Sequence, residues 1–182
     1  MERLPTRLQG PAHLQPRVFR DGRGFFMETF REGVLADLGI DHRWVQDNHS
    51  RSTRGVLRGM HFAVGAGSAK LVRCARGAIY DVVVDLRRAS PTFGQWEAFV
   101  LDDESLSVLY IPIGFAHGFC VTSEIADVIY KQSDYFDPGV EREIAFDDPD
   151  IAIAWPANVT PQVSERDLSA PRLRDVAADL TF

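Results

Sequence analysis

The chain has 182 residues, which predicts a single domain over residues 1–182 rather than a multidomain assembly. Hydrophobic residues make up 45% and charged residues 25%, and no apolar stretch approaches the roughly 18 residues that a membrane span needs. The 26 acidic residues outnumber the 20 basic ones and give a net charge of −6, which disfavours a nucleic-acid partner. We therefore expect a soluble protein that binds neither nucleic acid nor membrane.

The N-terminal residues MERLPTRLQGPAHLQP contain no apolar core of a signal peptide, so we expect a cytoplasmic protein. Cys74 and Cys120 lie in apolar alternating segments without CxxC spacing. This context favours buried free thiols over a disulfide or a zinc site. All the basic residues except Lys70 and Lys131 are arginines, which suit a local site for one or two phosphates.

The first predicted element is a helix near residues 30–38, where apolar residues recur at helical spacing and Gly39 follows as a C-terminal cap. Short segments rich in β-branched and aromatic residues come next, each closed by a turn residue, and they predict strands. These strands cover residues 70–75, 78–86, 96–101, 106–111, 117–122 and 126–133. The first two flank the turn Arg76-Gly77 and are interpreted as a hairpin.

A spacing of about ten residues between strands predicts an all-β sandwich or barrel rather than βαβ units. A second short helix is expected from Pro171, a favourable first helical position, and both helices should be peripheral. Neither a repeat nor a Gly/Ser-rich linker suggests a domain boundary.

Four polar clusters lie beside apolar strand residues, at 21–28, 46–50, 58–61 and 112–117. Each cluster alone also fits a turn or a hydrogen-bonded core residue. In a barrel whose side chains alternate between wall and interior, four such clusters would converge on the mouth. Together they favour a pocket.

The segment Pro112-x-Gly114-x-x-His117 resembles the second metal-binding motif of cupin proteins. A metal-binding cupin also has two histidines one residue apart, whereas His61 is followed by Phe62 and Ala63. With too few ligands for a tight site, we expect no metal. A neutral-pH proton-transfer site is the favoured alternative, with His61 as base and Arg58 and Lys70 as cations that stabilise an enolate.

Several longer blocks carry a family resemblance, and they follow one another in order over about residues 1 to 170. The blocks are VQDNHS (45–50), GVLRGMHF (55–62), KLVR (70–73), DLRR (85–88), SPTFG (90–94), IPIGFAHGF (111–119) and DPD (148–150). On these blocks the chain resembles the dTDP-4-dehydrorhamnose 3,5-epimerase family. The resemblance implies a cupin jelly roll, a homodimer, and no metal or organic cofactor. It also implies inversion of C3 and C5 in dTDP-4-dehydro-6-deoxy-D-glucose, a nucleotide-activated 4-keto-6-deoxyhexose.

The resemblance also implies roles for individual residues. His61 matches the general base, Asp167 its carboxylate partner, Lys70 the lysine near the ketone oxygen, and Tyr130 the first of two family tyrosines. The residues that match substrate-contact positions are Arg58, His117, Gln46, Asn48, Arg166 and Phe136. An N-terminal segment of about residues 1–45 is expected to reach the partner subunit's site, through Phe19, Arg23, Phe26 and Glu28.

Two positions depart from the family pattern: Phe136 replaces the second family tyrosine, which returns a proton to carbon, and Arg166 replaces a common lysine. Phenylalanine has no proton to give. Tyr130, the adjacent Tyr135 or a water is therefore considered as the replacement. The alternatives are an epimerase that acts at C3 or C5 only, one that acts on another nucleotide sugar, and a nucleotide-sugar binding protein without turnover.

Overall fold

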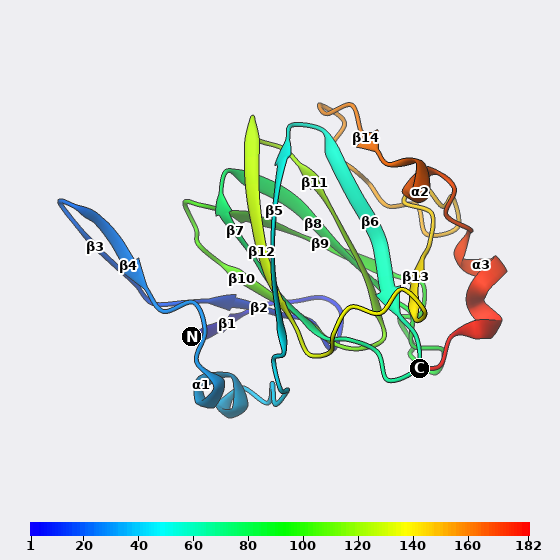
Figure 1. The fold of residues 1–182 in the computed structure, drawn as a ribbon, viewed down its shortest axis with the longest axis horizontal. Coiled ribbons are helices and arrows are strands. Elements are labelled where there is room, and N and C mark those ends of the chain that lie inside the picture. Colours follow the sequence, from blue (N-terminus) through cyan, green and yellow to red (C-terminus); the bar gives the residue numbers. More distant parts are fainter.

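The computed structural model describes residues 1–182 and consists mainly of antiparallel β-sheets (Figure 1). The first large sheet, called here the β5 sheet, has the order β1-β2-β10-β7-β12-β5. Its strands are β1 (Glu2–Leu4), β2 (Ala12–Gln15), β10 (Val108–Ile111), β7 (Lys70–Arg76), β12 (Ile125–Gln132) and β5 (Gln46–Thr53). The predicted all-β class is confirmed.

The second large sheet, called here the β6 sheet, has the order β13-β6-β11-β8-β9, and β14 pairs with β6. Its strands are β13 (Glu141–Glu143), β6 (Val56–Ala63), β11 (Phe115–Val121), β8 (Ala78–Asp85), β9 (Trp96–Asp102) and β14 (Gln162–Val163). The strands β5 and β6, which contain two of the polar clusters, were not predicted as strands.

The hairpin predicted from residues 70–86 is wrong, although both of its strands exist. β7 pairs with β10 and β12, whereas β8 pairs with β9 and β11. The chain therefore crosses from one sheet to the other at Gly77. This glycine has φ +75°, and a Cβ at this position would lie 2.0 Å from the Ile125 carbonyl oxygen. Only glycine fits such a close crossing.

The apolar side chains between the two sheets form the main core, with contributions from Val72, Val83, Phe115, Phe119 and Val128. The β11 strand is buried along its whole length. Both cysteines are free and buried, as predicted. Polar residues on β6, β7, β11 and β12 interrupt this core, and they line a cavity between the sheets.

The helices are short and peripheral. α1 (Glu32–Asp37) packs Leu35 against the outer face of the β5 sheet, and Gly39 follows with φ +75°, as predicted. The helix expected after Pro171 is present as α3 (Leu173–Val176), which a 3-10 turn, Ala177–Asp179, extends. A further helix, α2 (Glu165–Leu168), was not predicted. None of the helices is long and apolar enough to cross a membrane.

The hairpin formed by β3 (Val18–Asp21) and β4 (Gly24–Met27) projects away from the two large sheets (Figure 1). Its aromatic side chains are open to solvent: Phe19 is 50% exposed, Phe25 50% and Phe26 71%. Apolar side chains of this size normally pack against something, so the exposed hairpin indicates a contact surface.

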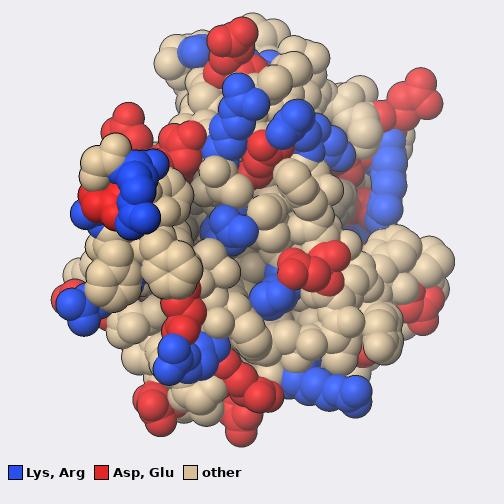
Figure 2. All heavy atoms as spheres, turned by 60° about the vertical axis from the view of Figure 1, so that its left-hand side comes forward, with Lys and Arg blue, Asp and Glu red and all other residues tan.

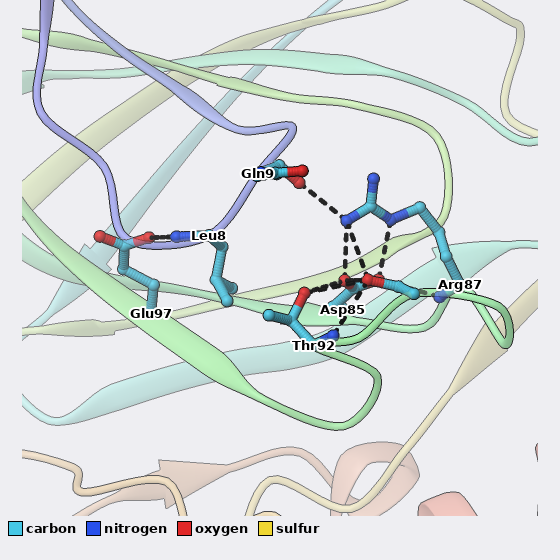
Figure 3. Close-up of polar contacts among 7 residues, drawn as sticks. Leu8, Gln9, Asp85, Arg87, Thr92 and Glu97 are labelled. Atoms are coloured by element: carbon cyan, nitrogen blue, oxygen red, sulfur yellow. Dashed lines mark hydrogen bonds and ion pairs between the residues drawn. The ribbon is translucent and has the colours of Figure 1, made fainter.

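Asp85, a buried carboxylate on β8, is linked through Arg87 to the N-terminal segment (Figure 3). Asp85 accepts hydrogen bonds from Arg87, Ser90 and Thr92, and Arg87 also donates to the carbonyl oxygen of Gln9. Burial acts to raise the pKa of Asp85, but these hydrogen bonds outweigh it and hold the pKa at about 2.

Candidate active site

A cavity of about 500 Å³ opens between the two large sheets. It is lined by side chains from β5, β6, β7, β11 and β12 together with the segment 162–167. The predicted site residues that line it are Arg58, His61, Lys70, His117, Tyr130, Arg166 and Asp167. Residues more than one hundred positions apart in the sequence thus meet in one concave site.

Strand pairing places the two histidines next to each other. His61 on β6 and His117 on β11 are direct cross-strand partners, and the register shifts immediately after His117. A Cβ at Gly118 would lie 2.5 Å from the Met60 sulfur and 2.8 Å from the Arg58 carbonyl oxygen. The glycine therefore allows the two strands to approach closely where the histidines enter the cavity.

His61 and Asp167 form a hydrogen-bonded pair. Nε2 of His61 lies 2.7 Å from Oδ1 of Asp167, whose side chain is 5% exposed. Ser164 caps α2 and accepts from the Asp167 backbone N–H, which fixes the turn that carries the carboxylate. Burial acts to raise the pKa of Asp167, but the hydrogen bond and charge of His61 outweigh it, so the pKa is lowered.

Lys70 and Tyr130 present free polar groups to the same cavity. Neither side chain makes a hydrogen bond or an ion pair within the chain. Burial lowers the pKa of Lys70, against the opposing charges of Glu141 and Asp81. Burial raises the pKa of Tyr130, so its hydroxyl keeps its proton at neutral pH.

Asp81 and Glu143 were not predicted from the sequence, and each pairs with a predicted site residue. Nε2 of His117 lies 3.0 and 2.9 Å from the two carboxylate oxygens of Asp81, which is fully buried. Arg166 pairs with Glu143 at 2.5 Å. The signal for Asp81 was present in the sequence: it is a charged residue directly before the apolar run Val82 to Val84 of a predicted strand.

Arg58 is held by a hydroxyl rather than a carboxylate. Its Nε and Nη2 donate to Oγ of Ser52 at 3.2 and 3.1 Å. Because Ser52 does not neutralise the guanidinium, the charge of Arg58 is free to attract an anion in the cavity.

Gln46, Asn48 and Phe136 lie outside the lining of this cavity. The Phe136 N–H donates to Oε1 of Gln46, Nε2 of Gln46 donates to Oδ1 of Asn48, and Nδ2 of Asn48 donates to Oε1 of the buried Gln132. The Phe136 ring is 52% exposed. Tyr135 lines a different hollow, beside residues 63–68, so it does not replace the missing hydroxyl in the cavity.

The N-terminal candidates do not enter the cavity of their own chain. Phe19, Arg23 and Phe26 line a hollow on the projecting hairpin, where Arg23 pairs with Asp21. Glu28 follows the hairpin and pairs with Arg31.

On the face shown in Figure 2, basic and acidic side chains are interspersed. Positive charge on this face is therefore not gathered into a basic patch. No group of three or more His, Cys, Asp or Glu side chains lies close enough to hold a metal ion.

Residues 5–175 match the family model described as dTDP-4-dehydrorhamnose 3,5-epimerase. The chain belongs to this family. A Neisseria gonorrhoeae relative named dTDP-4-dehydrorhamnose 3,5-epimerase is 46% identical over 169 residues, which cover 93% of this chain and 52% of the relative. The chain thus spans about half the length of that relative.

Other members of the family differ in the reaction that their names give. A Streptomyces niveus relative named dTDP-4-dehydrorhamnose 3-epimerase is 42% identical over 172 residues, 93% of this chain and 83% of the relative.

The structure of a Legionella pneumophila dTDP-6-deoxy-D-glucose-3,5-epimerase, in complex with dTDP-4-keto-L-rhamnose, superimposes with a TM-score of 0.95. It is 42% identical, and the match covers 98% of this chain and 95% of that one. The resemblance noted in the sequence is confirmed at the level of the family.

Proposed function

We propose that this chain epimerises dTDP-4-dehydro-6-deoxy-D-glucose at C3 and C5. The observation that carries the proposal is the cavity in which a hydrogen-bonded His–Asp pair, a buried amine and a phenolic hydroxyl meet. A ketone at C4 acidifies the protons on both neighbouring carbons, so one site that stabilises an enolate can serve either centre. The sugar nucleotide in the Legionella structure belongs to the same substrate class.

In this proposal His61 removes the proton. Asp167 accepts the hydrogen of Nε2, which leaves Nδ1 as the basic nitrogen and stabilises the imidazolium that forms. The proton leaves carbon for the imidazole, and the electron pair of the C–H bond moves onto the ketone oxygen as an enolate.

Lys70 and Tyr130 are proposed to stabilise the enolate and to return a proton to carbon. The Lys70 amine stabilises the enolate oxygen, and developing negative charge there favours its ammonium form despite burial. The Tyr130 hydroxyl, which burial keeps protonated, returns a proton to carbon from the other face. The His61 imidazolium then releases its proton to solvent and the Tyr130 phenolate takes one up, so the proposed cycle closes without a metal or an organic cofactor.

Arg58 and Arg166 are the cations of the cavity that suit a diphosphate. Gln46 and Asn48 on β5 and the nearby Phe136 contact one another outside the cavity lining. We propose that these three residues contact the nucleotide part of the substrate. The protein is proposed to act in the cytoplasm, which suits its two free, buried cysteines.

The active form is proposed to be a homodimer in which residues 1–45 contribute to the partner's site. The exposed rings of Phe19 and Phe26 suit contact with a nucleobase, and Arg23 suits a diphosphate. Glu28 follows them on the same segment. Mixing His61→Ala with Phe26→Ala tests this. With shared sites each variant alone is impaired, and mixed dimers regain one intact site and activity. With separate sites Phe26→Ala is active by itself, and mixing adds nothing.

A second candidate is inversion at C3 or C5 alone. Phe136 in place of the family tyrosine favours it, and so does the Streptomyces niveus relative with a 3-epimerase name. The same chemistry on another nucleotide sugar is a further form of this candidate.

The deciding experiment is incubation with dTDP-4-dehydro-6-deoxy-D-glucose in deuterium oxide, followed by proton NMR of C3 and C5. Deuterium with inversion at both carbons is expected from the proposed function. Exchange at one carbon would support the second candidate. Tight binding without any exchange would instead indicate a non-catalytic nucleotide-sugar binding protein.

A further inference from the structure

Gln132 is a buried polar residue of β12 that the proposed reaction does not use. Only 4% of its surface is exposed, and β12 lies between β5 and β7 in the β5 sheet (Figure 1). The cross-strand partners of Gln132 are Gln46 on β5 and Lys70 on β7. Tyr130, two residues earlier on the same face of β12, pairs with Asn48. Gln132 therefore adjoins both the proposed nucleotide contacts and the lysine of the cavity.

The side chains of Gln46, Asn48 and Gln132 form a continuous row of amides. The row begins at the Phe136 backbone N–H, which can only donate and therefore requires the oxygen of Gln46 at that end. Nε2 of Gln46 must then face Asn48, at 3.0 Å from Oδ1, which leaves Nδ2 of Asn48 to face Oε1 of Gln132 at 2.9 Å. The row ends at Ser68, whose Oγ lies 3.5 Å from Nε2 of Gln132. One backbone N–H thus decides the orientation of all three amides.

Gln132 supplies the acceptor that holds the two β5 amides in this orientation. Its Oε1 accepts from Asn48 at 2.9 Å and from Gln46 at 3.4 Å. These bonds and the one between the β5 amides use both amide hydrogens of Gln46 and one of Asn48, so Asn48 keeps one hydrogen without a partner. No other acceptor in the chain holds Nδ2 of Asn48, so without the Gln132 oxygen this amide is free to turn over.

We propose that Gln132 is a positioning residue, which holds the Asn48 amide as a hydrogen-bond donor to an acceptor oxygen of the bound nucleotide. This inference rests on the proposed function, in which Asn48 contacts the nucleotide. Asn48 lies on the same face of β5 as Ser50, two residues away, and Ser50 lines the cavity. A ligand that fills the cavity and extends along β5 therefore reaches the free hydrogen of Asn48. Phosphate and thymine carbonyl oxygens are acceptors of this kind.

The test removes the acceptor of Gln132 and asks whether the effect passes through Asn48. Gln132→Met lacks the amide but nearly keeps the volume of the side chain, and Gln132→Leu removes the same acceptor with a different shape. Asn48→Ala, alone and combined with each replacement, completes a double-mutant cycle. Gln15→Met is the matched control, because the Gln15 amide donates to the Ser105 carbonyl oxygen and lies outside the cavity lining.

The measurement is the dissociation constant of dTDP by titration calorimetry, together with kcat and KM for hydrogen exchange in the sugar nucleotide. Both Gln132 variants are expected to weaken dTDP binding and raise KM by about tenfold, typical of one hydrogen bond. The value of kcat should stay within about threefold, because a bond to the nucleotide is equally strong in the ground and transition states. In the Asn48→Ala background the same replacements should change dTDP affinity by less than about twofold. Gln15→Met should bind dTDP as the wild type does.

The same titrations with dTMP and thymidine identify the acceptor oxygen. A loss of affinity for the phosphorylated ligands but not for thymidine would support a bond from Asn48 to a phosphate. An equal loss for all three ligands would support a bond to the nucleoside.

Wild-type affinity for dTDP in both Gln132 variants would overturn the inference. So would a loss of the same size in the Asn48→Ala background, or a fall in kcat alone, which would mean that Gln132 acts on Lys70. A wild type that does not bind dTDP would contradict both this inference and the proposed function. A wild type that shows the coupled losses of affinity but never exchanges hydrogen would contradict only the proposed function.

Discussion

Two buried aspartates four residues apart on β8 have opposite surroundings. Asp85 is enclosed by donors from Arg87, Ser90 and Thr92, and the remaining hydrogen-bonding capacity of Arg87 is directed to the carbonyl oxygen of Gln9. Asp81 holds one nitrogen of His117 and leaves the other free beside the cavity.

Both aspartates are fully buried, so burial alone does not distinguish structure from function. What differs is whether the surrounding polar groups are satisfied within the chain. A network whose hydrogen bonds are all made within the chain, called here a closed network, rigidifies the fold. Polar groups that have no partner in the chain and line a concave site are available to bind a ligand.

Removal of the proposed base should have the largest effect. In His61→Ala the exchange of C3 and C5 protons is expected to fall by about 10³-fold or more, because the variant lacks the imidazole that is proposed to take the proton from carbon. Deuterium incorporation measured by NMR gives the rate. His49→Ala, an exposed histidine outside the cavity, is the control and should retain the wild-type rate. Unchanged exchange in His61→Ala would contradict its role.

The proposed acid should separate exchange from inversion. In Tyr130→Phe, His61 still removes and returns protons, so deuterium enters, but inversion is expected to fall by about 10²-fold because the opposite face lacks a donor. Phe136→Tyr should change both rates by less than about threefold, since Phe136 is half exposed and lies outside the cavity lining. A large gain of inversion in Phe136→Tyr would instead make position 136 the site of the acid.

The sequence predicted the all-β class but not how the strands pair. His61, Lys70 and Asp167 were proposed as site residues through the family resemblance, and the structure brings all three into one cavity. The hairpin at residues 70–86 was wrong, because alternation of apolar residues predicts strands but not which sheet they join. The charge of Asp81 beside an apolar run hinted at a buried role, but this local signal does not show its partner, because His117 lies on a strand 36 positions away.

The closed network at Asp85 should affect stability and not catalysis. Arg87→Met leaves the buried carboxylate without its charged partner, and the free energy of unfolding at pH 7 is expected to fall by about 3 kcal/mol. Urea unfolding measures this change. The value of kcat/KM should remain within about twofold of wild type, since neither residue lines the cavity. A large loss of activity in a variant of normal stability would remove the distinction between the two aspartates.

The smallest effect concerns the pH dependence of stability. The folded pKa of Asp85 is about 2, below its usual value of 3.8, so its contribution to stability is present above pH 4 and is lost as the pH falls through 2. Between pH 6 and pH 2.5 this contribution should decrease by about 1.5 kcal/mol. Other carboxylates titrate over the same range, so the test compares the wild type with Asp85→Asn by urea unfolding at both pH values. The variant should lose less stability than the wild type by that amount. Equal losses would mean that hydrogen bonds to Asp85 do not distinguish its charged form, and the network would then act through packing alone.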